Sequence, residues 1–156
     1  MAISFWINII TPVLVDMRII GDGLSTSLIL SLTDAPFTLL SLGSQFDNIT
    51  PSSVSIPSYG LSYTSSLDSI KKDLTFSFSA PQWQANHYYS GFSVILDSNG
   101  HFQKSDSSSA SSGSTQPVWS TTQGGITNDG SVIWTESAGV PLGQFPITFN
   151  TVYLGE

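Results

Sequence analysis

The chain has 156 residues, four basic and eleven acidic side chains, a net charge of −7 at pH 7 and no cysteine. This length fits one domain, or one domain with a small insertion, and it suffices for an apolar core without metal ions or disulfides. Because phosphate neutralisation needs clustered cations, the charge balance argues against nucleic-acid binding. Charged residues make up only 10% of the chain, and serine and threonine take their place on the expected surface.

The first fifteen residues, MAISFWINIITPVLV, are apolar but do not fit a targeting or membrane segment. A secretory signal needs a basic n-region and a small-residue cleavage site, and this stretch has neither. A membrane span needs about 20 apolar residues, and Asn8, Pro12 and Asp16 interrupt this one. We therefore expect neither a signal peptide nor a membrane partner.

The same stretch has the alternation of a β-strand. Phe5, Ile7 and Ile9 are separated by Trp6 and Asn8, which is a period of two. One interpretation is a strand with one face in the core of its own chain. The other is an inter-subunit arm, in which Phe5, Trp6, Ile7 and Ile9 pack on a neighbouring copy.

Strand patterns continue along the chain. The clearest lies at 73–80, where the apolar residues of DLTFSFSA alternate with small polar ones. Further strands are predicted at 26–34, 91–97, 101–106, 130–136 and 145–155. Segment 66–74 has the pattern of a helix start but leads directly into a strand, so we expect one short turn there at most.

Turn residues separate these strands. The predicted turn-forming residues are Asn99, Gly100, Gly124, Asp129 and Gly130, and the Asn-Gly pair is a strong hairpin signal. Residues 105–116, SDSSSASSGSTQ, are predicted to form a mobile serine-rich loop, because they offer little apolar area to bury.

Short strands at this spacing predict an all-β fold, an antiparallel β-sandwich with a small inserted or appended β-hairpin module. The sandwich is assigned to residues 1–80 plus 140–156. Residues 81–139 are assigned to a small Trp/Gly-rich β module, which holds three of the four tryptophans.

The stretch 83–139 resembles a small module recurrent in bacteriophage tail and other virion proteins, often described as carbohydrate-binding-like. The matching positions are Trp83, Tyr89, Gly91, Asn99-Gly100, Gly113, Pro117, Trp119, Gly124, Asp129-Gly130 and Trp134. The register has no gaps from Pro117 onward. Two departures are Ser120, where the pattern usually has proline, and a longer serine run before Gly113.

Three interpretations of the aromatic residues are open. The Asp-Gly turn lets Trp119 and Trp134 approach each other across two strands, where they would fill a small core. Alternatively, an exposed indole stacks on a sugar ring, or the aromatic residues contact another protein. The candidates for carbohydrate or partner contact are Trp83, Tyr88, Tyr89, Trp119 and Trp134.

The sequence offers little catalytic chemistry. His87 and His101 are the only histidines, and a zinc site without cysteine would need both together with carboxylates. Asp97 and Asp129 are typical turn residues that bond their own backbone. There is no Gly-x-Ser-x-Gly elbow and no phosphate-binding glycine loop. We expect no enzyme, no cofactor and no metal site.

The resemblance implies a bacteriophage virion protein that assembles in the host cytoplasm. Two functions are open: a capsid decoration (cement) or exposed accessory protein, and a tail fibre or baseplate-type adhesin that binds host-surface carbohydrate. The implied partners are the major capsid or tail proteins, host glycans for the adhesin, and the chain itself. Decoration and fibre proteins are often trimeric, so the resemblance implies a homotrimer.

Overall fold

The computed structural model describes residues 4–11, 14–31, 46–48, 54–55, 60–68, 70–71, 73–150 and 152–153. These residues form strands β1–β15, and none of them lies in a helix. Every pair of neighbouring strands is antiparallel. The predicted all-β, antiparallel fold class is therefore confirmed.

The first sheet joins the two ends of the sequence. It has three strands in the order β1 (Ser4–Thr11), β2 (Leu14–Gly21) and β14 (Gly143–Asn150). In its register Phe5 pairs with Ile19, and Ile19 with Phe145. Ile19 and Phe145 are buried, so this face of the sheet points into the protein. The N-terminal strand exists as predicted, while the side chains of Phe5, Trp6, Ile7 and Ile9 lie outside the described part.

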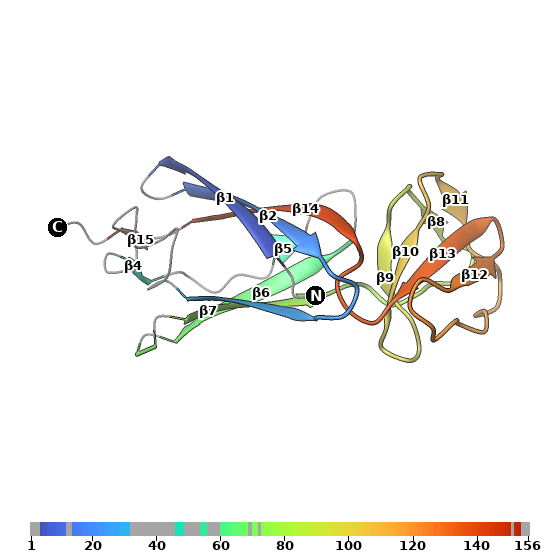
Figure 1. The fold of residues 1–156 in the computed structure, drawn as a ribbon. Helices are drawn as coiled ribbons and strands as arrows, with labels where there is room; N and C mark the ends of the chain where they lie inside the picture. Colours follow the sequence, from blue (N-terminus) through green and yellow to red (C-terminus); the bar gives the residue numbers. More distant parts are fainter. Residues whose placement is uncertain are drawn as a thin grey trace.

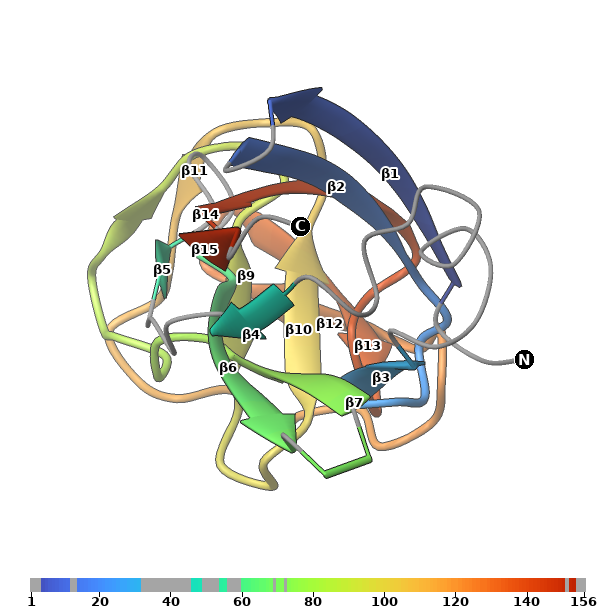
Figure 2. The same cartoon turned by 90° about the vertical axis from the view of Figure 1, so that its left-hand side faces the viewer.

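A second sheet supplies a large share of the buried apolar residues. Its four strands run in the order β3 (Ser27–Ser31), β7 (Asp73–Ser79), β6 (Ser62–Asp68) and β5 (Val54–Ser55). Figure 2 shows it below the first sheet, on the opposite side of the molecule. The alternation predicted at 73–80 is confirmed by the buried residues Leu74, Phe76, Phe78 and Ala80.

The segment 66–74 contains one short turn, at residues 70–71, as predicted. Its first three residues belong to β6 and its last two to β7. The turn is closed by Asp68, whose Oδ1 accepts the backbone N–H groups of Ile70 and Lys71, both at 3.0 Å. A capping carboxylate and a hairpin account for the pattern that resembled a helix start.

The remaining strands pair among themselves. A short pair joins β4 (Phe46–Asn48) to β15 (Val152–Tyr153). A four-stranded sheet has the order β12 (Ile126–Asp129), β13 (Val132–Ser137), β10 (Phe102–Ser105) and β9 (Val94–Leu96), and β11 (Ala110–Ser111) pairs with β8 (Tyr88–Tyr89). Figure 1 shows β8–β13 together at one end of an elongated molecule. We call residues 81–139 the module.

Two glycine turns and a serine-rich segment shape the module. Gly100, in the turn between β9 and β10, has φ 79°, and Gly130, between β12 and β13, has φ 61°. A Cβ on Gly130 would lie 2.7 Å from the carbonyl oxygen of Ser111, so the site accepts only glycine. Part of the predicted serine-rich loop is β11, and the buried Ser112 donates its Oγ–H to the carbonyl of Gln84 at 2.7 Å. The prediction of a continuous loop at 105–116 is therefore wrong.

Phe76→Ala tests the buried core beside the sheet β3-β7-β6-β5. Phe76 is fully buried and packs edge-to-face on Tyr63, with ring centroids 5.5 Å apart. We expect the free energy of unfolding to fall by about 3–5 kcal/mol, because the truncation leaves a cavity. Urea unfolding measures this. Ser77→Ala, at an exposed position of the same strand, is the control and should change stability by less than about 0.5 kcal/mol.

Candidate functional site

The carboxylate of Asp129 holds the module together. Asp129 ends β12 and is only 3% exposed. Its Oδ2 accepts the indole Nε1–H of Trp83 at 2.7 Å and that of Trp134 at 3.0 Å. Its Oδ1 accepts the backbone N–H of Gly113 at 2.7 Å. Hydrogen bonds to a carboxylate are roughly twice as strong as neutral ones. One side chain therefore ties β12 to the neighbouring strand β13 and to two segments further away in the sequence.

The aromatic rings pack around this carboxylate. The ring of Trp134, which is fully buried, lies 6.3 Å from that of Trp119 and 5.0 Å from that of Tyr89, both edge-to-face. Such pairs contribute about 0.5–1.5 kcal/mol each beyond the area they bury. Ile95 and Val132 complete this core. Burial raises the pKa of the Tyr89 hydroxyl, so it stays neutral and accepts the Gln84 N–H at 2.9 Å.

The predicted contact residues therefore divide into two groups. Trp119, Trp134 and Tyr89 are buried, and their rings offer no free face to a sugar. Trp83 is partly buried, and its N–H is taken up by Asp129. Only Tyr88, which is 66% exposed, presents most of its ring to solvent.

The predicted turn residues lie in turns, but the two aspartates differ in their bonding. Asp97 acts as expected, since its Oδ1 accepts the N–H of Asn99 at 2.7 Å and that of His101 at 3.0 Å. Asp129 instead bonds groups far from its own turn. Gly124 has φ 75°, and its N–H donates to the carbonyl of Glu136 at 3.0 Å.

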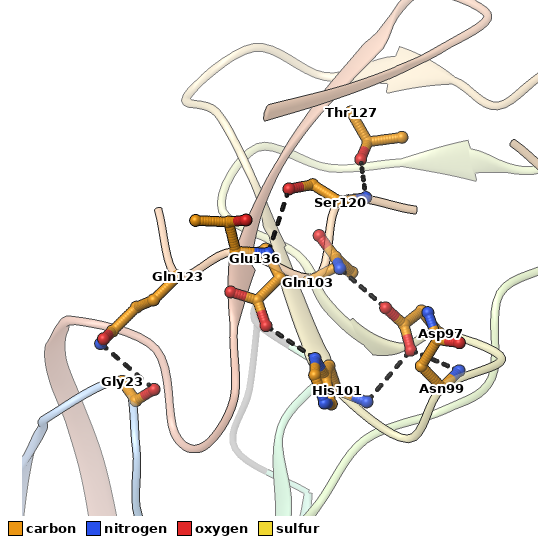
Figure 3. Close-up of polar contacts among 10 residues, drawn as sticks. Gly23, Asp97, Asn99, His101, Gln103, Ser120, Gln123, Thr127 and Glu136 are labelled. Carbon is orange, nitrogen blue, oxygen red and sulfur yellow. Dashed lines mark hydrogen bonds and ion pairs between the residues drawn. The ribbon is translucent and has the colours of Figure 1, made fainter. Parts of the chain in front are cut away.

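A buried polar cluster lies at the β9–β10 hairpin. The Oδ2 of Asp97 accepts from Gln103 Nε2 at 2.8 Å, and His101 Nδ1 lies 2.7 Å from Glu136 Oε1 (Figure 3). Asp97, Gln103 and Glu136 are all buried. Within the described residues no group of three or more His, Cys, Asp or Glu side chains could hold a metal ion. The cluster fixes the hairpin against β13. Apart from the Asp-x-Asn-Gly turn, no pattern in the sequence predicted it.

A cavity of 310 Å³ lies where the module meets the turn after β2 and the segment before β14. It is lined by Lys104, Gln123, Thr135, Ser137, Pro141 and Leu142, among others. The Lys104 Nζ donates to the carbonyl of Leu142 at 3.0 Å. The same amine lies 5.5 Å from the ring centroid of Phe92 and 5.7 Å from that of Phe145. Sequence reasoning missed this site, although Lys104 is the only basic residue after position 72.

Comparison with known proteins gave no relatives: no family model, no curated protein and no solved structure matches the chain. In the described part of the chain, no helix is long and apolar enough to cross a bilayer.

Asp129→Ala tests the central carboxylate. The change leaves two indole N–H groups and one backbone N–H without their acceptor, and each buried unpaired donor costs about 1–3 kcal/mol. We expect a loss of roughly 3 kcal/mol or more in unfolding free energy, with a shift in tryptophan fluorescence. Chemical denaturation followed by fluorescence measures both. Asn128→Ala, at an exposed position of the same strand, should leave both nearly unchanged.

Proposed function

We propose that this chain is a non-enzymatic structural protein of a bacteriophage particle, a capsid decoration (cement) or exposed accessory protein. The observation that carries the proposal is the agreement between the virion-module pattern and the bonds inside the module. The pattern requires Trp83, Gly113, Asp129 and Trp134, and these four residues share one carboxylate. The spacing thus reflects a folding requirement rather than chance composition.

The surface of the module supports a display role. Its exposed residues are mostly serine, threonine, asparagine and glutamine, and its core already uses most of its large aromatic rings. Such a surface is polar but almost uncharged, which suits a stable unit carried on the outside of a particle. Such a display role requires no catalytic residues.

The first sheet supports contact with other subunits. β1 is an edge strand, and its sequence SFWINIIT carries no charged residue. Within the described residues no strand pairs with its outer side. Long apolar edge strands are normally covered or paired. We assign this edge to a neighbouring copy in a homotrimer, or to the major capsid protein.

A phage whose genome encodes this chain provides the test. Particles lacking the protein should release DNA at a lower temperature than complete particles, and added recombinant protein should restore the difference. Mass spectrometry of purified particles should count hundreds of copies. The Asp129→Ala protein is a control for folding and should restore less.

Two results would contradict the decoration role. Purified particles without the protein would reject a virion component. A handful of copies per particle, with unchanged capsid stability, would instead indicate a tail protein.

A second role, binding of host-surface carbohydrate, is favoured by the exposed ring of Tyr88. This residue is 66% exposed and lies on β8. If the module binds glycans, Tyr88→Ala should abolish binding on a bacterial polysaccharide array without changing the denaturation midpoint. Ile126→Ala is the matched control, since Ile126 is 65% exposed and lies on β12. Unchanged binding by Tyr88→Ala, or no binding by the intact protein, would reject the adhesin role.

A further inference from the structure

The 310 Å³ cavity between the module and the segment before β14 is lined by Lys104, whose amine forms no ion pair with a carboxylate among the described residues. Lys104 lies on β10, and its Nζ is bordered by the rings of Phe92 and Phe145. Burial lowers the pKa of Lys104, and within the described residues no carboxylate pairs with it. The amine donates one hydrogen bond, to the carbonyl of Leu142. An ammonium has three N–H donors, so two are available to a ligand.

Glu136 also lines the cavity, but it does not form an ion pair with Lys104. Side chains alternate between the two faces of a strand. Thr135 stands opposite Lys104 in the register and shares its face, whereas Glu136 stands opposite Gln103. One oxygen of the Glu136 carboxylate, Oε1, is bonded to His101, and the other, Oε2, has no hydrogen-bond partner among the described residues. Lys104 is therefore a cation with no paired carboxylate among the described residues, in a chain whose net charge is −7.

Other hydrogen-bond donors line the same cavity. Ser137 is only 4% exposed, and its Oγ has no hydrogen-bond partner among the described residues. A buried hydroxyl without a partner costs free energy unless a ligand or water satisfies it. Gln123 makes only one long bond from its amide, 3.4 Å to the carbonyl of Gly23 (Figure 3). A Cβ on Gly23 would lie 2.6 Å from that amide nitrogen and 3.3 Å from the Ser137 Oγ, so the two donors border the same point.

We propose that this cavity binds a small carboxylate. Lys104 forms the ion pair, Gln123 and Ser137 donate hydrogen bonds, and Pro141 and Leu142 contact the apolar part of the ligand. Its volume of 310 Å³ lies at the lower end of small-molecule sites and suits a sugar acid or the carboxylate end of a short peptide. The site is independent of any role in a phage particle.

Titration followed by amide NMR spectra of the full chain tests the site. The probes are sodium acetate, sodium glucuronate and N-acetylglycine, and glucose with sodium chloride at matched ionic strength is the neutral control. Saturable shifts at the amides of Gly23, Gly124 and Ser137 are expected with the carboxylates and not with glucose. Tighter binding of glucuronate than of N-acetylglycine identifies a sugar acid as the preferred ligand. The reverse order identifies the C-terminal carboxylate of a peptide as the preferred ligand.

Matched variants decide whether these residues bind the ligand. Lys104→Met keeps the aliphatic stem between the two rings and should weaken carboxylate binding roughly tenfold or more, because the charge is lost. Lys71→Met removes an exposed lysine elsewhere and should leave affinity unchanged. Gln123→Ala, at an exposed position, should weaken carboxylate binding several-fold. If Lys104→Met does not fold, this second variant shows whether the cavity residues bind the carboxylate. Absence of saturable shifts, equal binding of glucose, or wild-type affinity in a folded Lys104→Met protein would overturn the proposal.

Discussion

The module depends on one buried carboxylate. The two indole N–H groups that Asp129 accepts come from a residue 46 positions before it and a residue five positions after it. Removing an acceptor from such a site leaves buried donors unpaired, which is costlier than losing an ordinary contact. With only a handful of apolar residues in its core, the module has few other sources of stability. The turn at Gly130 matters for the same reason, because it lets Ser111–Gly113 approach closely enough to reach the carboxylate.

This arrangement changes what the aromatic residues can do. An indole that is buried and bonded through its N–H cannot also stack on a ligand at the surface. Of the five predicted contact residues, only Tyr88 and part of Trp83 are therefore left for outward contact. The abundant polar, uncharged surface and the apolar edge strand of the first sheet fit a protein that works by association. These features are the basis of the proposed place in a phage particle.

The junction between the module and the rest of the chain has a different character. Lys104 reaches from β10 to the carbonyl of Leu142, just before β14, and lies against a ring from each side of the junction. The cation thus links the module to the first sheet through its stem and amine. Donors gather around it, and the neighbouring acid on β13 is engaged by His101.

The sequence by itself determined the all-β class, most strand positions and the turns, because a period of two and the Asn-Gly and Asp-Gly pairs are local signals. It predicted the alternation at 73–80 and the hairpin at Gly100 for that reason. It did not separate a buried aromatic ring from an exposed one, since Tyr88 and Tyr89 are neighbours with opposite environments. It also treated Asp129 as a turn residue and assigned no role to Lys104. Only the tertiary structure decided these roles, because each depends on groups brought together from distant segments by strand pairing.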